Sequence, residues 1–416
     1  MSNDRLIIQG GKPLFGDVKI SGAKNAVLPL ISISLLFSNG FSLKNVPDLV
    51  DTRLMIKLIN SLGIMTKFYD GTIDFYGEPQ NIEAPKELVS KMRASVLVLA
   101  PLLSKRNNAL IPMPGGCEIG ERPINLHIDA LKKLGAETSF QNGFLRATLP
   151  FGEFRGNKIK FPQVSVGATE CAIMAATLAK GKTIIYNAAR EPEIIDLGKC
   201  LNLAGAKIKG LGTEKIEING VEKLNPVTYS VIPDRIEAGS FAIIAGITKG
   251  EINLLNLNPK DLNSFFKTLK QANINVDIYD KTVTVKGSYK INSVNIKTEP
   301  HPGFPTDLQA QFMSLMSIAN GCSVIEENIF ENRFMHVPEL CKMDASIKVN
   351  GNKAIVSGVQ QLNGSSVKAT DLRASMSLIA ASLNAKGKSI VNDLSHLKRG
   401  YENFEDKLFN LGANLK

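Results

Sequence analysis

The feature that most constrains the fold of this chain is a sequence repeat with a period of roughly 70 residues. In each repeat an amphipathic helical pattern ends in the triplet Leu-Gly-Ala or a near relative of it. Only the second and the sixth triplets match Leu-Gly-Ala in full, and the period is longer than that of solenoid arrays. The six triplets are Leu62-Gly63-Ile64, Leu134-Gly135-Ala136, Ala204-Gly205-Ala206, Ala272-Asn273-Ile274, Met343-Asp344-Ala345 and Leu411-Gly412-Ala413.

A β-hairpin is expected after each of the first five triplets. In the first repeat, alternating residues 66–69 and 72–76 flank Asp70-Gly71, and a similar pattern covers 276–285. Asp-Gly or Asn-Gly between two alternating runs is the strongest short-range hairpin signal. Each repeat therefore contains at least two antiparallel strands.

Each repeat also predicts a second helix, which is apolar on most sides. The runs 172–179 and 241–247 carry no charge, so these helices should be buried. A glycine follows five of the six helices and is interpreted as the signal that ends each one: Gly40, Gly181, Gly250, Gly321 and Gly387. The helices are expected to begin near Lys24, Arg93, Ala168, Gly239, Leu308 and Arg373.

The sixth repeat is incomplete, which predicts a discontinuous domain. The chain ends at Lys416 without strands after the last triplet, whereas 6–11 and 17–20 are strand-like and precede the first helix. We expect these N-terminal strands to close the last repeat. The fold class is then α/β, with two inside-out prism domains of three sheet-plus-two-helix repeats each. The predicted domains are 22–231 and 1–21 plus 232–416. Six recurrences in one order disfavour the alternative, which is chance similarity between independent α/β elements.

Composition narrows the class of function. The N-terminus is polar, and the apolar run 26–37 is interrupted by Pro29, Ser32 and Ser34, so no membrane segment is expected and the predicted location is the cytoplasm. Five cysteines and four histidines are scattered without ligand-like spacing, which predicts neither disulfides nor a metal site. The net charge of +10 suits an anionic partner. The chain has no tryptophan and no Lys/Arg block longer than two residues, which disfavours nucleic acid.

One loop combines a thiol with a guanidinium. Residues 112–123 contain three prolines, Gly115-Gly116, Cys117 and Arg122, between two apolar stretches. A loop of this kind is typical of a lid over an anionic substrate. The alternative is that Cys117 is a small buried hydrophobic residue, as a lone intracellular cysteine most often is.

Charged residues occur where the repeat should be apolar. Lys24, Arg93 and Arg373 stand at the starts of buried helices, where the helix dipole favours anions over cations. An anionic ligand would explain all three, and the alternative is a structural salt bridge such as Arg373 with Asp371. Asp307 follows a proline-rich loop and could be a plain N-cap. Arg399 lies in a turn and could be a solvated charge.

These segments together resemble the UDP-N-acetylglucosamine 1-carboxyvinyltransferase family, which belongs to the EPSP synthase superfamily. The resemblance extends over essentially the whole chain in the right order. It implies two inside-out α/β domains of three repeats each, with a cleft between them. The segments that carry it are 21–29, 115–123, 165–169, 187–193, 302–309, 331–340, 371–375 and 399–402.

The resemblance implies a reaction without cofactor or metal. The enolpyruvyl group of phosphoenolpyruvate would move to the 3′-hydroxyl of UDP-N-acetylglucosamine by addition and elimination, with release of phosphate. This is the first committed step of peptidoglycan synthesis, so it implies roles in cell wall biogenesis, cell shape and cell division. Neither nucleic acid nor a membrane would be a partner. The family is the target of fosfomycin, which alkylates the thiol at Cys117.

The resemblance also assigns residues. Cys117 would be the acid and Asp307 the base, with Lys24 and Arg399 completing the catalytic set. The phosphoenolpyruvate-binding residues would be Lys24, Asn25, Arg122, Arg373 and Arg399. The UDP-N-acetylglucosamine-binding residues would be Asn25, Arg93, Arg122, Pro123, Ile124, Asn125, Leu126, Ser165, Val166, Gly167, Asp307 and Ile329.

Two residues depart from the family pattern, and two other functions compete. Gln163 stands where a lysine is common and Asn125 where an aspartate is frequent, which bears on nucleotide affinity. The sister enzyme that uses shikimate 3-phosphate has the same fold and chemistry but lacks the Gly-Gly-Cys loop. A basic repeat protein that binds nucleic acid would leave the loop, Asp307 and the cations of the buried helices unexplained.

Overall fold

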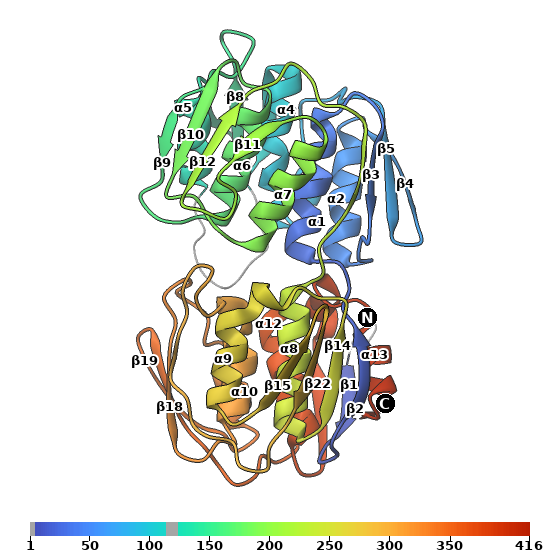
Figure 1. The fold of residues 1–416 in the computed structure, drawn as a ribbon, viewed down its shortest axis with the longest axis vertical. Coiled ribbons are helices and arrows are strands. Elements are labelled where there is room, and N and C mark those ends of the chain that lie inside the picture. The colour runs from blue at the N-terminus through green and yellow to red at the C-terminus, as the bar shows by residue number, and fades with distance from the viewer. Residues whose placement is uncertain (1–4, 114–123) are drawn as a thin grey trace. The chain divides into compact units, whose positions relative to one another are not determined.

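The computed structural model describes residues 5–113 and 124–416, which form two compact units (Figure 1). The first unit comprises 22–113 and 124–232, and the second comprises 5–21 and 233–416. Each unit contains three small sheets around apolar helices, so the predicted α/β class with three repeats per unit is confirmed. The assignment of 22–231 and of 1–21 plus 232–416 as separate folding domains stays a prediction.

In the first unit the sheets have the strand orders β13-β3-β5-β4, β6-β8-β7 and β11-β12-β10-β9. The elements of this unit are α1 (Lys24–Ser32), η1 (Ile33–Leu36), β3 (Phe41–Lys44), α2 (Val50–Ser61), β4 (Met65–Tyr69), β5 (Thr72–Tyr76), α3 (Lys86–Val89), η2 (Arg93–Val98), α4 (Leu99–Arg106), β6 (Asn108–Pro112), α5 (Asn125–Lys133), β7 (Glu137–Gln141), β8 (Phe144–Thr148), β9 (Lys158–Lys160), α6 (Val166–Thr177), β10 (Lys182–Tyr186), α7 (Pro192–Leu203), β11 (Lys207–Lys209), β12 (Lys215–Asn219) and β13 (Val227–Ser230).

In the second unit the sheets have the strand orders β15-β16-β14-β2, β17-β18-β20-β19 and β21-β22-β1-β23. The elements of this unit are β1 (Arg5–Gln9), β2 (Phe15–Lys19), α8 (Arg235–Thr248), β14 (Glu251–Leu255), η3 (Pro259–Leu262), α9 (Asn263–Gln271), β15 (Asn275–Tyr279), β16 (Thr282–Lys286), β17 (Ile296–Lys297), η4 (Thr306–Leu308), α10 (Gln309–Met316), β18 (Cys322–Glu326), α11 (Val337–Cys341), β19 (Ser346–Asn350), β20 (Lys353–Ser357), β21 (Ser366–Lys368), α12 (Leu372–Asn384), β22 (Lys388–Asn392), η5 (Leu394–Arg399), α13 (Phe404–Asn410) and β23 (Asn414–Leu415).

The helices predicted to be apolar on most sides form the centre of each unit. In the second unit α8, α10 and α12 pack against one another, and every residue of α8 from Ile236 to Thr248 is buried. In the first unit α6 is buried from Ala168 to Thr177 and packs on α4. Burial of each large aliphatic side chain contributes about 1.5–3 kcal/mol, so these uncharged runs carry much of the stability of each unit.

The predicted hairpins are confirmed. Met65 pairs with Tyr76 across β4 and β5, and Asn275 pairs with Lys286 across β15 and β16. In the first of these turns Asp70 and Gly71 have φ values of 44° and 67°. Positive φ at both central residues matches the right-handed twist of the strands, which explains the Asp-Gly signal.

Gly250 follows the C-cap of α8 and donates its N–H to the Ala245 carbonyl at 3.0 Å, so it marks a helix end as predicted. Gly181 and Gly387 have a different role from the one predicted. In the structure α6 ends at Thr177 and α12 at Asn384, whereas Gly181 and Gly387 come directly before β10 and β22. Both have positive φ values, 92° and 89°. These glycines therefore turn the chain into the next strand and do not cap the helices, because only glycine adopts this backbone conformation without strain.

The N-terminal strands divide between two sheets. β1 pairs with β22 and β23, so it closes the last repeat as predicted. β2, however, pairs in parallel with β14 and completes the fourth repeat instead. The counterpart of β2 is β13, which pairs in parallel with β3 in the first repeat. In the sequence β2 comes just before α1. In the structure β2 belongs to the second unit and α1 to the first, because the division between the units falls after Ser21.

Buried carboxylates hold the two chain segments at this boundary. Asp196 of α7 accepts a hydrogen bond from the Tyr229 hydroxyl at 2.6 Å and another from the backbone of Ile232. Glu237 of α8 accepts from the backbone N–H of Ser21 at 2.7 Å and from Lys407 at 2.6 Å. Burial is the main influence on both carboxyl groups and raises each pKa to about 7.

The raised pKa of Asp196 predicts a pH-dependent stability. The folded chain holds this proton more tightly than the unfolded chain, where the pKa is near 3.8. The free energy of unfolding should therefore fall as the pH rises from about 4 to 7, by up to about 1.4 kcal/mol per pH unit for this group. We expect Asp196→Asn to flatten that slope, as measured by urea unfolding at pH 5 and pH 7.5. Asp74→Asn, which removes a carboxyl group whose pKa is lowered by its hydrogen bond from Ser42, should leave the slope unchanged. Equal slopes for wild type and Asp196→Asn would contradict this expectation.

Candidate active site

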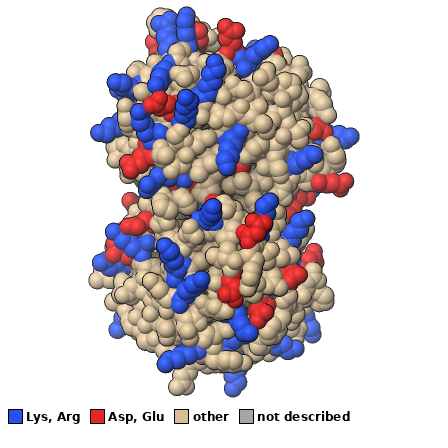
Figure 2. Space-filling view, in the orientation of Figure 1, with Lys and Arg blue, Asp and Glu red and all other residues tan. Residues whose placement is uncertain are grey.

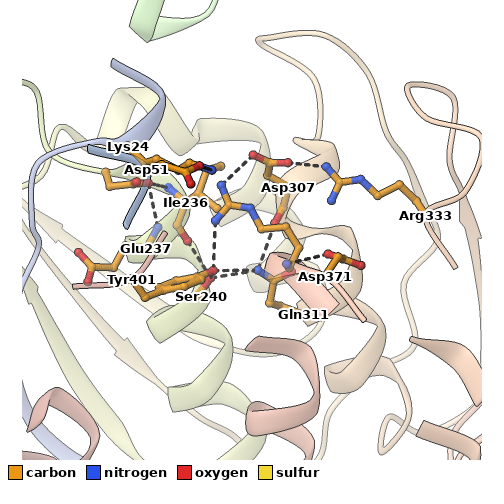
Figure 3. Close-up of polar contacts among 12 residues, drawn as sticks. Lys24, Asp51, Ile236, Glu237, Ser240, Asp307, Gln311, Arg333, Asp371 and Tyr401 are labelled. Atoms are coloured by element: carbon orange, nitrogen blue, oxygen red, sulfur yellow. Dashed lines mark hydrogen bonds and ion pairs between the residues drawn. The ribbon is translucent and has the colours of Figure 1, made fainter. Parts of the chain in front are cut away.

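Asp307 lies between two arginines in the second unit. Its Oδ1 accepts a hydrogen bond from Arg333 Nη2 at 2.7 Å, and its Oδ2 accepts one from Arg373 Nη2 at 2.9 Å (Figure 3). The arginine side chains are only 5% and 6% exposed, whereas the Asp307 side chain is 22% exposed. Charge-assisted hydrogen bonds of this kind are about twice as strong as neutral ones. The site thus presents a fixed carboxylate, more exposed than the two buried cations that hold it.

The salt-bridge alternative holds for Arg373, with Asp307 and not Asp371 as its partner, whereas Asp307 is not a plain N-cap. The side chain of Asp307 binds two guanidinium groups, and the residue sits within η4 instead of capping α10. Asp371 caps α12 by accepting hydrogen bonds from the backbone N–H groups of Arg373 and Ala374 at 2.8 and 3.1 Å. Burial lowers the pKa of Arg373, but Asp307 and Tyr401 raise it by more, so it lies above its ordinary value.

The loop after β18 brings Ile329 and Arg333 to the same site. Glu327 accepts hydrogen bonds from the Thr306 hydroxyl at 2.9 Å and from the backbone N–H of Ile329 at 2.8 Å. The Arg333 guanidinium also lies 5.0 Å from the ring of Phe330. Because Thr306 precedes Asp307, Glu327 fixes the predicted nucleotide-binding residue Ile329 relative to the predicted base.

Arg399 lies close in sequence to a residue of the same cluster. It is the last residue of η5, and Tyr401 follows two residues later with its side chain buried. The Tyr401 hydroxyl lies 3.4 Å from Arg373 Nη1. Asp307 and Arg373 are therefore in direct contact within the second unit, and Arg399 lies two residues before Tyr401 in the same unit.

Lys24 forms a separate cluster in the first unit. It begins α1, and its Nζ lies 3.0 Å from Oδ2 of Asp51, in the first turn of α2. Asp51 is 2% exposed and Lys24 is 14% exposed. The salt-bridge alternative therefore holds for Lys24, and Asn25 follows it in the first turn of α1.

The predicted nucleotide-binding residues of the first unit also come together. Ser165 caps α6 by accepting from the backbone N–H of Ala168 at 3.4 Å. A Cβ atom at Gly167 would lie 2.8 Å from Nε2 of His127, so glycine is needed for the close contact between α5 and α6. Burial and the charge of Arg93 lower the pKa of His127 to about 4, so its imidazole is neutral at pH 7.

That contact joins the start of α5, which follows Ile124 and contains Asn125 and Leu126, to the start of α6, which contains Val166. A helix N-terminus beside an arginine suits a phosphate group. The remaining predicted residues, Cys117, Arg122 and Pro123, lie outside the described residues, so their places in the site stay predictions.

Sequence reasoning missed three residues of these clusters. Arg333 was available as a signal, since it is an arginine within the family-like segment 331–340. Tyr401 had the same signal, since it lies within the family-like segment 399–402. Asp51 gave no signal of its own, because its partner Lys24 lies 27 residues away along the chain. In the described part of the chain, no group of three or more His, Cys, Asp or Glu side chains could hold a metal ion.

Comparison with known proteins matches this chain and its fold to one family. Residues 8–408 match the family model described as EPSP synthase (3-phosphoshikimate 1-carboxyvinyltransferase). UDP-N-acetylglucosamine 1-carboxyvinyltransferases from Gluconobacter oxydans and Zymomonas mobilis are 49% and 48% identical to the chain, and each alignment covers 99% of both proteins. The fold is similar to that of the enolpyruvyl transferase NikO from Streptomyces tendae, with a TM-score of 0.87 at 23% identity over 99% and 98% of the two chains. An EPSP synthase from Acinetobacter baumannii gives a TM-score of 0.76 at 17% identity, over 99% of each chain.

The protein is thus an enolpyruvyl transferase, by its fold and by its relatives. The chain belongs to the EPSP synthase family, and within that family to the UDP-N-acetylglucosamine 1-carboxyvinyltransferases.

Proposed function

We propose that this protein transfers the enolpyruvyl group of phosphoenolpyruvate to the 3′-hydroxyl of UDP-N-acetylglucosamine and releases phosphate. The observation that carries the proposal is identity of 48–49% over 99% of the chain to relatives named for this activity. The product would commit UDP-N-acetylglucosamine to peptidoglycan synthesis in the cytoplasm. The protein would then serve cell wall biogenesis, and through it cell shape and division.

The proposed reaction adds and then eliminates. Protonation of the phosphoenolpyruvate methylene carbon by the Cys117 thiol makes the neighbouring carbon electrophilic. The 3′-oxygen of the sugar attacks that carbon, and Asp307 takes the hydroxyl proton. The tetrahedral adduct then returns a proton from its methyl group to the Cys117 thiolate while the bond to the phosphate oxygen breaks and phosphate leaves. An unperturbed thiol is mostly protonated at neutral pH, which suits the donor, and a fixed carboxylate suits the base.

The hydrogen bonds that Arg333 and Arg373 donate to Asp307, here called the clamp, are compatible with a role of Asp307 as the base. Each carboxylate oxygen has two lone-pair sites, and each receives one arginine hydrogen bond in the clamp. The two guanidinium groups fix the carboxylate plane, so the hydroxyl meets a base in one orientation.

Cations would hold phosphoenolpyruvate. We assign Lys24, Asn25, Arg122, Arg373 and Arg399 to its phosphate and carboxylate. Arg373 uses Nη2 for Asp307 and Nη1 for Tyr401, and a guanidinium has five N–H donors, so others stay available for the substrate. Arginine forks fit both anionic groups in a bidentate manner.

The cluster around α6 would bind the nucleotide. We assign Arg93, the segment 122–126 and the segment 165–167 to UDP-N-acetylglucosamine, together with Ile329 and Asp307. The N-terminus of α6 supplies N–H groups for a diphosphate, and the neutral His127 adds no competing charge near Arg93. Gln163 and Asn125 would change the affinity for the nucleotide without changing the reaction.

Two competing functions are disfavoured. The sister enzyme specific for shikimate 3-phosphate lacks the Gly-Gly-Cys sequence that this chain has at 115–117. A nucleic-acid-binding protein needs a continuous basic surface. On the face shown in Figure 2, Lys and Arg side chains are interspersed with Asp and Glu.

Within the described ranges, none of the helices combines the length and the hydrophobicity that a membrane crossing needs.

The proposal is tested by following phosphate release from phosphoenolpyruvate in the purified protein. We expect release that requires UDP-N-acetylglucosamine, and no release with shikimate 3-phosphate as the acceptor. Release with shikimate 3-phosphate alone would assign the protein to the sister activity. Absence of release with either acceptor would overturn the proposed reaction.

A further inference from the structure

The hydroxyl of Tyr401 lies at the centre of a buried polar network behind Asp307. It is 2.7 Å from the Ser240 hydroxyl, 3.2 Å from Gln311 Nε2 and 3.4 Å from Arg373 Nη1 (Figure 3). The Arg373 guanidinium carbon also lies 5.7 Å from the centre of the Tyr401 ring. One side chain thus contacts the arginine that holds Asp307 both through its hydroxyl and over its ring face.

The hydrogen bonds of this network can be assigned a direction. Ser240 donates its single proton to the backbone carbonyl of Ile236 at 2.8 Å. Ser240 must then accept from Tyr401, which uses the one phenolic proton. The phenolic oxygen keeps two acceptor sites, and these receive Gln311 and Arg373. The Tyr401 hydroxyl is therefore fully used, as one donor and two acceptors.

The same network also holds the backbone that carries Asp307. The Gln311 amide has two N–H donors and three acceptors within reach, so these acceptors share its protons. They are the carbonyl oxygen of Asp307 at 3.1 Å, the Ser240 hydroxyl at 3.1 Å and the Tyr401 hydroxyl at 3.2 Å. Ser240 belongs to α8, Gln311 to α10 and Arg373 to α12, so the three central helices of the second unit meet at Tyr401. The network therefore connects the main chain of Asp307 with the cation that binds its Oδ2.

Burial of these side chains favours one arrangement of their hydrogen bonds over others. Ser240 and Gln311 are fully buried, and Tyr401 and Arg373 are 2% and 5% exposed. Burial raises the pKa of Tyr401, although Arg373 acts in the opposite direction, so the phenol stays neutral and keeps its donor proton. In such surroundings an unmatched polar group costs about 1–3 kcal/mol, which favours the one arrangement in which the hydroxyl of Tyr401 is matched.

We propose that Tyr401 is a positioning residue for enolpyruvyl transfer: its hydroxyl orients Arg373, and thereby aims the Asp307 carboxylate at the sugar hydroxyl. Tyr401 also fixes the chain two residues after Arg399. A single buried side chain therefore positions both Arg399, which is proposed to bind phosphoenolpyruvate, and the proposed base Asp307. This inference rests on the proposed function. Tyr401 itself touches neither substrate in this account.

Tyr401→Phe tests the inference, because it keeps the ring beneath Arg373 and removes only the hydroxyl. We expect kcat to fall about 10- to 100-fold, since misplacement of a reacting group by about 1 Å costs on that order. The dissociation constant of UDP-N-acetylglucosamine, measured by calorimetry, should change less than about twofold, because the nucleotide-binding residues of the first unit are untouched. This split between kcat and binding separates positioning from general damage to the fold.

Tyr229→Phe is the matched control. It makes the same substitution at a partly buried tyrosine of the first unit, whose hydroxyl donates to the buried Asp196 at 2.6 Å. We expect both variants to lose thermal stability and only Tyr401→Phe to lose kcat. A wild-type kcat in Tyr401→Phe would overturn the inference, and so would an equal loss of kcat in the two variants.

Ser240→Ala provides a second measurement if Tyr401→Phe fails to fold. It removes the acceptor of the Tyr401 proton but keeps the hydroxyl beside Arg373, so a smaller fall in kcat is expected. An unchanged kcat in Ser240→Ala would count against the network. Failure of the proposed function is recognised separately, because the wild-type protein would then release no phosphate with UDP-N-acetylglucosamine.

Discussion

The Asp307→Asn substitution is expected to lower kcat at least about hundredfold, because an amide cannot take the proton of the sugar hydroxyl and a positioned base contributes about 10²–10⁴ in rate. UDP-N-acetylglucosamine should still bind, since the cluster around α6 is unchanged. The measurement is steady-state phosphate release combined with calorimetric titration of the nucleotide sugar. A kcat within threefold of the wild-type value would remove Asp307 as the base.

This substitution also has a structural cost. Arg333 and Arg373 would remain buried without their carboxylate, and breaking a buried ion pair costs about 3–5 kcal/mol. The thermal midpoint must therefore be measured beside the rate. Asp307→Glu is the companion variant, because it keeps the charge for both arginines and displaces the carboxylate by one methylene. It should keep more of the stability and still lose kcat, whereas Asp74→Asn on an outer sheet should leave kcat unchanged.

The Cys117→Ala substitution is the second large expected effect. The thiol is the proposed donor of the proton to the phosphoenolpyruvate methylene carbon, so its removal should lower kcat by about 10²–10⁴ at neutral pH. Binding of UDP-N-acetylglucosamine should change little. The outcome that contradicts this role is a variant that releases phosphate at the wild-type rate.

Fosfomycin labelling provides an independent test of the same thiol. We expect the drug to block alkylation of Cys117, as followed by mass spectrometry of its peptide, and to leave the exposed Cys322 and Cys341 reactive. Cys171 and Cys200 serve as unreactive references, because burial raises the pKa of both thiols. Unchanged alkylation of Cys117 in the presence of fosfomycin would exclude it as the target.

Most of the fold could be predicted because its determinants are local. An Asp-Gly turn such as Asp70-Gly71 fixes a hairpin through backbone sterics, and an uncharged helix such as α8 must be buried. The pairing of β2 with β14 could not be predicted in the same way, because it depends on where the chain passes between the units. Gly181 and Gly387 were located correctly but assigned to the wrong element, since a positive φ serves a helix end and a strand entry equally well.

The sequence predicted which residues belong to the candidate site but not which residues they contact. The sequence indicated that Asp307 and Arg373 had unusual positions, but the bond between them spans 66 residues and follows from the packing of α10 on α12. Arg333 and Tyr401 were missed for the same reason. A buried polar network is defined by its hydrogen bonds, and these exist only once the helices have been placed.

The central claim concerns which oxygen receives the enolpyruvyl group, so the most direct measurement is of the product. Phosphoenolpyruvate labelled with carbon-13 would be incubated with UDP-N-acetylglucosamine and the wild-type protein, and the product examined by NMR. We predict a labelled enol ether bonded to the 3′-oxygen of the sugar, formed together with one phosphate per turnover. Label recovered only as pyruvate or as unreacted phosphoenolpyruvate would contradict the account.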